Sequence, residues 1–209
     1  METAVIGEEI AYSETLKTIY ERRAVRKYKE IPVDHELITK VLDAGRMAPS
    51  AINRQPWKFY ILTGKETIKT FSKEIAKVTA RTFVKTHSGT DVLKTAIHVF
   101  HMLKEGDLFK RPDPIFHGAP VVVFIAAPRD NEWAPIDIGM CAQNMMLAAK
   151  ALGLDSCPVG LAKYVEQTRI FSRLQVPLSE QVHMAIILGY GDEMPEAHQR
   201  IRNNAFFIE

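Results

Sequence analysis

The chain has little of what marks several large classes of protein, and each shortage narrows the choice. Its 209 residues contain two cysteines, Cys141 and Cys157, whose spacing fits neither a CxxC pair nor a metal site. That usage argues against a disulfide scaffold and suits a reducing compartment. No window reaches the roughly 18 apolar residues that a membrane-spanning helix needs. Lys and Arg number 27 against 25 Asp and Glu, so the net charge of +2 gives no bulk field for nucleic acid or membrane.

Several catalytic and binding motifs are also missing. Neither GxGxxG nor GxxxxGK occurs, which disfavours a Rossmann or P-loop protein, and the absence of GxSxG removes support for a hydrolase triad. His98, His101 and Glu105 could share one face of a helix, but the zincin spacing of two His residues four apart with an intervening Glu is absent. We therefore expect these three residues at a helix surface or an interface, and no metal site.

What is present indicates an ordinary globular protein. Apolar residues make up 46% of the chain and charged residues 25%, which argues against disorder. No repeat, low-complexity tract or flexible linker interrupts it, so residues 1–209 are expected to form a single domain. The first 14 residues are acidic and lack the basic start and apolar run of a secretory signal. A cytoplasmic protein is the expectation.

Periodicity and breaking residues predict the elements. Asp34 can cap a helix that must end before Pro49, Gly153 is a natural helix stop, and the run after Pro120 is apolar enough for a central strand. Helices are expected over Ser13–Arg22, 35–48, Lys65–Val84, Thr90–Lys104, Ile136–Leu152 and Glu166–Leu174; strands over Trp57–Thr63, 121–127 and Val182–Leu188; a turn or short strand over Ser156–Leu161; and a long proline-bearing loop over Gly106–Gly118. Strands separated by helices predict a three-layer α/β or α+β sandwich.

A cluster of cations follows the first predicted helix. Arg22, Arg23, Arg26 and Lys27 fall within six residues. On a continuing helix, Arg22 and Arg26 would share a face, as a bound phosphate would require. The same run is equally typical of a solvated helix end, where cations complement the helix dipole. The cluster alone does not decide between these interpretations.

A second segment, APSAINRQPW (residues 48–57), is less easily explained by structure alone. Two prolines bracket Ser50, Asn53 and Gln55, which makes a rigid turn that displays polar groups. Such a turn could hold a polar ring edge or a ribityl chain. It could also be a connector between a helix and a strand, with Trp57 in the core.

Together these two segments resemble the FMN-binding nitroreductase family. The family carries RRSxR-like and APSxxNxQPW-like motifs in this order and at about this spacing, and here only Ala24 departs, where a Ser is frequent. The likeness continues through HGAPVVVFIAA (117–127), through DIGMCAQNMMLAAKALGLDSCPVGL (137–161) and into the tail after Ile187. It implies a nitroreductase-like α+β fold, a three-layer α-β-α sandwich with a mixed central sheet. It also implies a C-terminal tail that extends onto a partner subunit.

The resemblance implies a cofactor site at a dimer interface. Arg22, Arg23, Ala24 and Arg26 would line the phosphate and pyrimidine end of FMN, with Arg26 as the candidate stabiliser of the reduced flavin. Backbone groups of the turn after Cys157 would approach the reactive ring edge, with Gly160 allowing close approach. Arg200 and Arg202 would complete the phosphate site from the tail. The full set of expected cofactor-binding residues is Arg22, Arg23, Ala24, Arg26, Pro158, Val159, Gly160, Arg200 and Arg202, with Pro49, Ser50, Ala51 and Asn53 from the other subunit.

The implied activity is an FMN-dependent oxidoreductase that takes hydride from NADPH or NADH and reduces a small flat acceptor by a ping-pong mechanism. Nitroaromatics, quinones, flavins and enones all fit that description, and neither the acceptor nor the nucleotide is decided. No side chain is expected to be catalytic, because the cofactor carries the chemistry. The alternatives are a flavin-binding protein without turnover, or a flavin-dependent dehalogenase or flavin-fragmenting relative. Because the site would need residues from two chains, a homodimer is expected.

Overall fold

The computed structural model describes residues 13–86, 112–201 and 203–208. Its helices and strands alternate along the chain, as the periodicity predicted. The elements are α1 (Glu14–Glu21), α2 (His35–Arg46), the 3-10 turn η1 (Ala51–Asn53), β1 (Lys58–Leu62), α3 (Lys65–Thr86), β2 (Val121–Pro128), α5 (Ala134–Ala151), β3 (Asp155–Val159), the 3-10 helices η2 (Gly160–Gln167) and η3 (Phe171–Leu174), and β4 (Glu180–Gly189).

The strands form one four-stranded sheet in the order β1-β2-β4-β3, and each neighbouring pair is antiparallel. β2 is paired on both edges and is buried along almost its whole length, as expected for a central strand. The prediction of a mixed sheet is therefore wrong for the described strands, which are all antiparallel, and the parallel bridge between Ala24 and Ser156 is an isolated one outside the strand-to-strand pairings. The extended chain after α1 therefore lies along the outer edge of β3.

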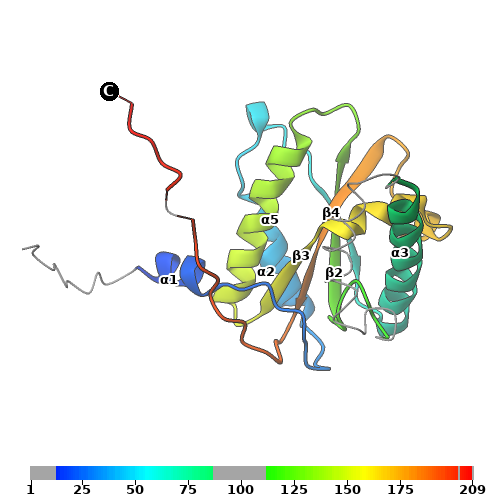
Figure 1. Cartoon of the computed structure of the whole chain (residues 1–209), viewed down its shortest axis with the longest axis horizontal. Coiled ribbons are helices and arrows are strands. Elements are labelled where there is room, and N and C mark those ends of the chain that lie inside the picture. The colour runs from blue at the N-terminus through cyan, green and yellow to red at the C-terminus, as the bar shows by residue number, and fades with distance from the viewer. Residues whose placement is uncertain (1–12, 87–111, 202, 209) are drawn as a thin grey trace, which may run out of the picture.

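Two hydrophobic clusters cover the two faces of this sheet, which confirms the three-layer α+β sandwich. In β2, Val122 and Phe124 belong to the cluster beneath α3, whereas Val121 and Val123 belong to the cluster beneath α2 and α5. This period of two is what a strand buried on both faces requires. Figure 1 shows α2 and α5 on one side of the strands and α3 on the other.

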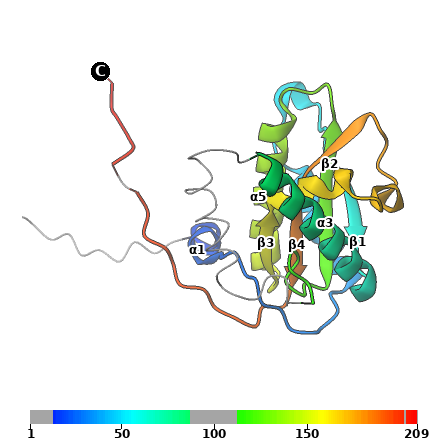
Figure 2. The same cartoon turned by 45° about the vertical axis from the view of Figure 1, so that its right-hand side comes forward.

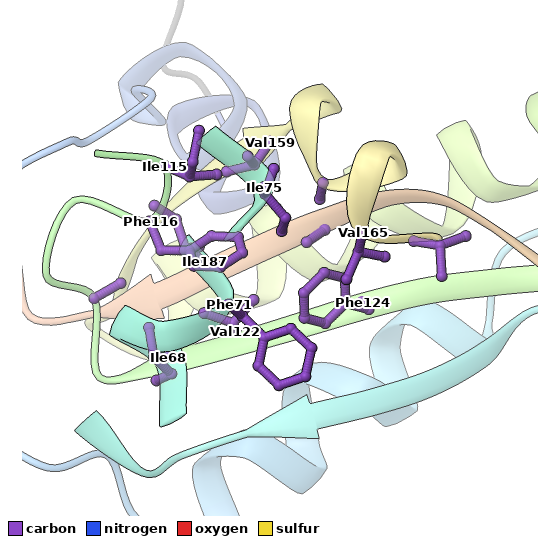
Figure 3. Packing of buried hydrophobic residues seen from close by; sticks show 14 of the residues in the cluster. Ile68, Phe71, Ile75, Ile115, Phe116, Val122, Phe124, Val159, Val165 and Ile187 are labelled. Carbon is purple, nitrogen blue, oxygen red and sulfur yellow. The ribbon is translucent and has the colours of Figure 1, made fainter. Parts of the chain in front are cut away.

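The cluster beneath α3 is built around aromatic rings. Phe124 of β2 meets Phe116 edge to face, with ring centroids 5.7 Å apart, and Phe71 of α3 at 6.1 Å. All three rings are fully buried (Figure 3). Truncating such a ring to Ala costs about 3–5 kcal/mol, so this cluster is a large part of what holds α3 to the sheet.

Helix ends follow the expected signals closely. The Ser13 and Asp34 side chains accept hydrogen bonds from the backbone N–H groups of Leu16 and Glu36, at the starts of α1 and α2. After α5 the chain turns at Gly153, whose φ of +77° is the left-handed conformation that glycine adopts readily. α5 begins at Ala134, two residues earlier than predicted.

Some predicted elements differ from the structure. The single helix expected over Glu166–Leu174 is two 3-10 helices separated at Thr168, whose backbone is extended and whose hydroxyl donates to the Val165 carbonyl. That side-chain bond competes with continued helix formation. The predicted helix Thr90–Lys104 and residues 106–111 of the predicted loop Gly106–Gly118 lie outside the described residues.

The chain beyond β4 leaves the body of the molecule. After Gly191 it runs away from the sheet and ends far from it (Figures 1 and 2). Phe206, Phe207 and Ile208 are 85–95% exposed at its end. Three large apolar side chains in solvent indicate a segment that docks on another surface, and the docking of this tail on a partner subunit remains a prediction.

Candidate functional site

The first half of the site is the arginine segment, residues 22–29, which is extended and not helical. α1 ends at Glu21, so the helical face proposed for Arg22 and Arg26 does not exist. The backbone N–H of Val25 instead donates to the Ser156 carbonyl at 3.1 Å, and that of Lys29 to the Tyr190 carbonyl at 2.9 Å. These hydrogen bonds, to Ser156 in β3 and to Tyr190 just after β4, therefore outweigh the tendency of this run to form a helix.

Close packing holds this segment against the end of β4. A Cβ added at Gly189 would lie 2.6 Å from Pro120 and 2.9 Å from the ring of Tyr28. The Tyr28 hydroxyl donates to the Val25 carbonyl at 2.8 Å, and burial raises its pKa, so the ring stays neutral. Only glycine at position 189 allows the segment to lie this close to the sheet.

The three arginines of the segment have different surroundings. Arg23 turns back and donates to the carbonyls of Tyr20 and Arg22, where it satisfies the end of α1. Within residues 13–86, 112–201 and 203–208, no ion pair joins any of the three to a carboxylate. Arg22 and Arg26 therefore retain guanidinium donors for a ligand.

Arg22 and Arg26 converge on β3. Burial raises the pKa of the Cys157 thiol, and the positive charges of Arg26 and Arg22 oppose that rise. Cys157 is thus a packed, protonated thiol beside two cations, which agrees with its expected packing role. Glu193 accepts a hydrogen bond from the backbone N–H of Arg26 at 2.5 Å and so ties the start of the tail to the same place.

The turn from β3 into η2 presents the expected Pro158, Val159 and Gly160. Pro158 and Gly160 are exposed, whereas Val159 is buried. At Gly160 the backbone φ is not positive, and no atom lies within 4 Å of an added Cβ. Neither local conformation nor the described packing requires a glycine here, so the backbone at Gly160 is open on that side.

The second half of the site is the loop 48–55, and its backbone is strained. Ile52, Asn53 and Gln55 all have positive φ, at 45°, 54° and 47°. Asn tolerates this region, but a β-branched residue such as Ile52 is an outlier there. Strained residues persist only where their surroundings over-determine them, and they gather at functional sites.

Side chains within the loop maintain that conformation. The Ser50 hydroxyl accepts from the backbone N–H of Gln55 at 2.9 Å, and the Asn53 side-chain carbonyl accepts from the Gln55 amide at 3.0 Å. Ser50 and Asn53 were predicted as ligands, and here they also shape the loop. Trp57, just after it, is buried in the core beneath α2 and α5.

One further residue that sequence reasoning missed joins this loop to the body. Asp137, in the first turn of α5, accepts a hydrogen bond from the backbone N–H of Ala51 at 3.1 Å. It is only 2% exposed. A charged residue between Ile136 and Ile138 was the available signal, because an acidic residue among apolar ones needs a buried partner. By contrast, Asn144 donates to the Ala44 carbonyl and Gln143 is exposed, so neither shows a ligand role.

Within one chain the two halves of the site do not meet. The loop 48–55 is tied to the start of α5, and the arginine segment lies at β3, just after its end. The 18 residues of α5 span about 27 Å at 1.5 Å per residue. Figure 1 shows η1 near one end of α5 and the chain after α1 near the other.

The described cavity nearest the arginine segment confirms this separation. It has a volume of about 1190 Å³ and is lined by Ala24 and Arg26, but by none of the other predicted cofactor-binding residues that are described. Its remaining walls come from the chain between residues 27 and 35, the start of α3, the chain leading into β2, and Glu193 and Pro195 of the tail. A single chain therefore supplies parts of the expected site and no complete enclosure of it.

The predicted tail arginines stand apart from both halves. Arg200 is exposed and donates to the nearby His198 carbonyl. Arg202 lies outside the described residues, as do His98, His101 and Glu105. In the described parts of the chain, no three side chains form a group that could hold a metal ion, and no helix is both long and apolar enough to cross a bilayer.

Comparison with known proteins gives one consistent family. A model of the nitroreductase family matches residues 19–190. A 4-nitrobenzoate reductase of Pseudomonas putida is 30% identical over 193 residues, covering 82% of this chain and 83% of that enzyme. A chloronitrobenzene nitroreductase of Comamonas testosteroni is 29% identical over 201 residues, covering 87% and 88%.

Solved structures show the same fold. A nitroreductase with bound FMN from Bacteroides fragilis superposes with a TM-score of 0.75 at 22% identity, over 95% of this chain and all of that one. A second, also with bound FMN, from Desulfitobacterium hafniense gives 0.76 at 22% identity with the same coverage. At these identities the superpositions establish the architecture.

Proposed function

The chain belongs to the nitroreductase family, and from that premise we propose that residues 1–209 form an FMN-dependent oxidoreductase. It takes hydride from NADPH or NADH and passes two electrons to a small flat acceptor, in a ping-pong order. The observation that carries the proposal is the placement of Arg22 and Arg26 beside β3, where the backbone of Val25 pairs with Ser156, without carboxylate partners in the described chain.

The described residues fit the cofactor. A phosphate with about two negative charges needs fixed cations, and Arg22 and Arg26 supply paired donors that cannot lose their protons. The open side of Gly160 leaves room for a flat ring beside the backbone. When bound, FMN supplies the hydride chemistry, and the cation of Arg26 near its pyrimidine end stabilises negative charge. Arg200 and Arg202 add to the phosphate site once the tail docks.

The second half of the site comes from a partner chain. α5 exposes Trp133, Ile136 and Met140, and nothing in the described chain lies within 4 Å of a Cβ added at Gly139. A glycine inside a helix costs about 1 kcal/mol relative to Ala, so its presence fits close packing of another helix. Two α5 helices packed antiparallel about a two-fold axis would bring the loop 48–55 of one chain to the arginine segment of the other.

The class of electron acceptor follows from the flat flavin ring on which it would stack. An acceptor of this kind stacks on the flat cofactor, and the two relatives named above act on nitroaromatic compounds by their names. We propose the same class here, with quinones and flavins as further acceptors. The protein contributes orientation and exclusion of water, and no side chain of the described site is placed as an acid or base.

The visible spectrum of the purified protein tests the proposal. FMN is added to the apoprotein, its binding constant is measured, and NADPH or NADH is then added without oxygen. Rapid bleaching of bound FMN, followed by reoxidation with nitrobenzoate, is the expected result. Bound FMN that neither nucleotide bleaches would instead favour a flavin-binding protein without turnover, and failure to bind FMN would reject the proposal.

Light scattering during size exclusion tests the assembly. The proposal requires a dimer that carries two FMN. A flavin-loaded monomer would contradict the two-chain site while leaving the redox activity to be judged by the spectrum.

A further inference from the structure

Asp137 is buried, although only one of its two carboxylate oxygens has a hydrogen-bond partner among the described residues. That oxygen accepts a hydrogen bond from the Ala51 N–H. Burial of a polar group without full compensation costs free energy, and each such group in a native structure calls for an explanation. An apolar residue here would avoid that cost and would still continue α5.

The loop that Asp137 contacts is the one with three non-glycine residues at positive φ. Its first residue, Ala48, donates to the Gly45 carbonyl near the end of α2. The other described hydrogen bonds after Pro49, from Asn53 to Ser50, from Arg54 to Ala51 and from Gln55 to Ser50 and Asn53, close on the loop itself. They preserve its internal shape but do not orient it. The bond from Ala51 to Asp137 joins it to the rigid helix.

We propose that Asp137 is a positioning residue for cofactor binding: it orients the turn Pro49–Asn53 so that this turn reaches the FMN held by the other chain's arginine segment. This inference rests on the proposed function. It assigns the orientation of a strained turn to a buried side chain that does not itself touch the cofactor. Placing an acceptor beneath the Ala51 N–H buries a second carboxylate oxygen that has no described partner, and this unfavourable burial is the energetic cost of the arrangement.

The first test compares FMN affinity in three variants. Asp137→Ala removes the acceptor and is expected to raise the FMN dissociation constant roughly tenfold, as for the loss of one strong hydrogen bond. Asp137→Asn keeps a carbonyl oxygen toward Ala51 and is expected to recover most of that loss. Glu74→Ala is the matched control, because Glu74 is also a buried carboxylate, accepts hydrogen bonds from Lys77 and Arg169, and lies in α3, on the opposite face of the sheet from α5.

The control variant distinguishes a loss of loop orientation from a general loss of protein stability. We expect both Ala variants to lower the melting temperature, but only Asp137→Ala to weaken FMN binding. Equal affinity of Asp137→Ala and the parent would overturn the inference, as would equal weakening by Glu74→Ala. In either case a parent that binds FMN leaves the proposed function standing, whereas a parent that does not bind FMN removes the function itself.

A double-mutant cycle tests the bond from its donor side. Ala51→Pro deletes the N–H that Asp137 accepts, and the backbone permits it, since Ala51 is the first residue of η1 and Ser50 before it is extended (φ −144°, ψ 155°). If the bond carries the effect, Asp137→Ala will weaken FMN binding no further in the Ala51→Pro background. Additive losses would show that Asp137 acts by another route.

Mixed dimers test which chain's cofactor the loop serves. One chain carries Arg22→Ala with Arg26→Ala, and the other carries Asp137→Ala. If each site takes its arginines from one chain and its loop from the other, one of the two sites in the mixed dimer has both parts intact. Mixed dimers should then regain one tightly bound FMN per dimer. If Asp137 served its own chain's arginines, no site would be intact and no tight binding would return.

Discussion

The arginine segment and the loop 48–55 are held in the fold by opposite means. The arginine segment is fixed through its backbone, by bonds to Ser156 and Tyr190, and its long side chains remain available. The loop 48–55 is fixed through side chains, those of Ser50, Asn53 and Asp137, and its backbone takes up an unusual conformation. The arginine segment is thus held by its backbone and presents side chains, whereas the loop 48–55 is held by side chains and presents its backbone.

This difference indicates what each half contributes to the proposed site. Free guanidinium groups recognise charge and tolerate small displacements, because long side chains adjust. A strained turn presents backbone and short polar groups at fixed positions and tolerates displacement poorly. The arginine segment should therefore govern affinity for the phosphate, and the loop should govern the fit around the ring and ribityl chain.

The largest expected effect comes from removing the free cations. Arg22→Ala combined with Arg26→Ala should raise the FMN dissociation constant at least about 100-fold, since each charged hydrogen-bonding partner contributes about 1.5–3 kcal/mol. Lys27→Ala, in the same segment, is the matched control and should change affinity by less than about threefold. Equal losses in the two proteins, measured by fluorescence titration, would mean that general charge and not position matters.

Next in size is a change that moves the backbone of the arginine segment and leaves its side chains intact. Gly189→Ala places a methyl group against Pro120 and Tyr28 and should lower the free energy of unfolding by about 1–3 kcal/mol. At Gly64 an added Cβ meets Thr67 at an ordinary 3.5 Å, so Gly64→Ala should cost less than about 1 kcal/mol. Urea unfolding of the FMN-free proteins measures both, and similar losses would contradict the close-approach argument.

A smaller effect of opposite sign is expected in the loop 48–55. Ile52 is 83% exposed and has a φ of 45°, so Ile52→Asn loses little burial and gains a residue that tolerates this conformation. The free energy of unfolding should rise by about 1 kcal/mol, or about 2–4 °C in melting temperature. Ile61→Asn, at an exposed strand position, is the control and should not stabilise. A lower melting temperature for Ile52→Asn would show that the turn is not strained.

The smallest effect concerns Cys141, a fully buried residue of α5 that packs against α2. Burial raises the pKa of its thiol from an ordinary 9.0 to about 12. The unfolded thiol ionises first as pH rises, so the stability linked to this group is complete below pH 9 and is lost between pH 9 and about 12. Cys141→Ala should flatten that part of the curve of unfolding free energy against pH. An unchanged slope would reject the assignment.

Much of the fold could be predicted because its signals are local. The apolar run after Pro120, the caps at Ser13 and Asp34, and the stop at Gly153 each act within a few residues. The extended path after Glu21 could not be predicted in the same way. It depends on bonds to Ser156 and Tyr190, more than 100 residues along the chain, which overrode the helical tendency of a basic run.

The candidate site shows the same division. Its residue types at Arg22, Arg26, Ser50 and Asn53 were recognisable, because charge and turn chemistry are properties of short segments. Asp137, between Ile136 and Ile138, signals only that some buried partner is needed; its role was not recognisable because the fold alone shows that the partner is Ala51. The strain at Ile52 was equally hidden, since nothing in a β-branched residue predicts a positive φ.

The sequence by itself determined most of the elements and the chemistry that the two motifs can offer, because these follow from short-range pattern, and the two motifs carried the resemblance to the family. Only the tertiary structure decided where that chemistry lies. It placed the two motifs at opposite ends of α5, a helix about 27 Å long. The reason is physical: a helix length is set by its residues, but which segments meet its two ends is set by long-range backbone pairing and side-chain packing.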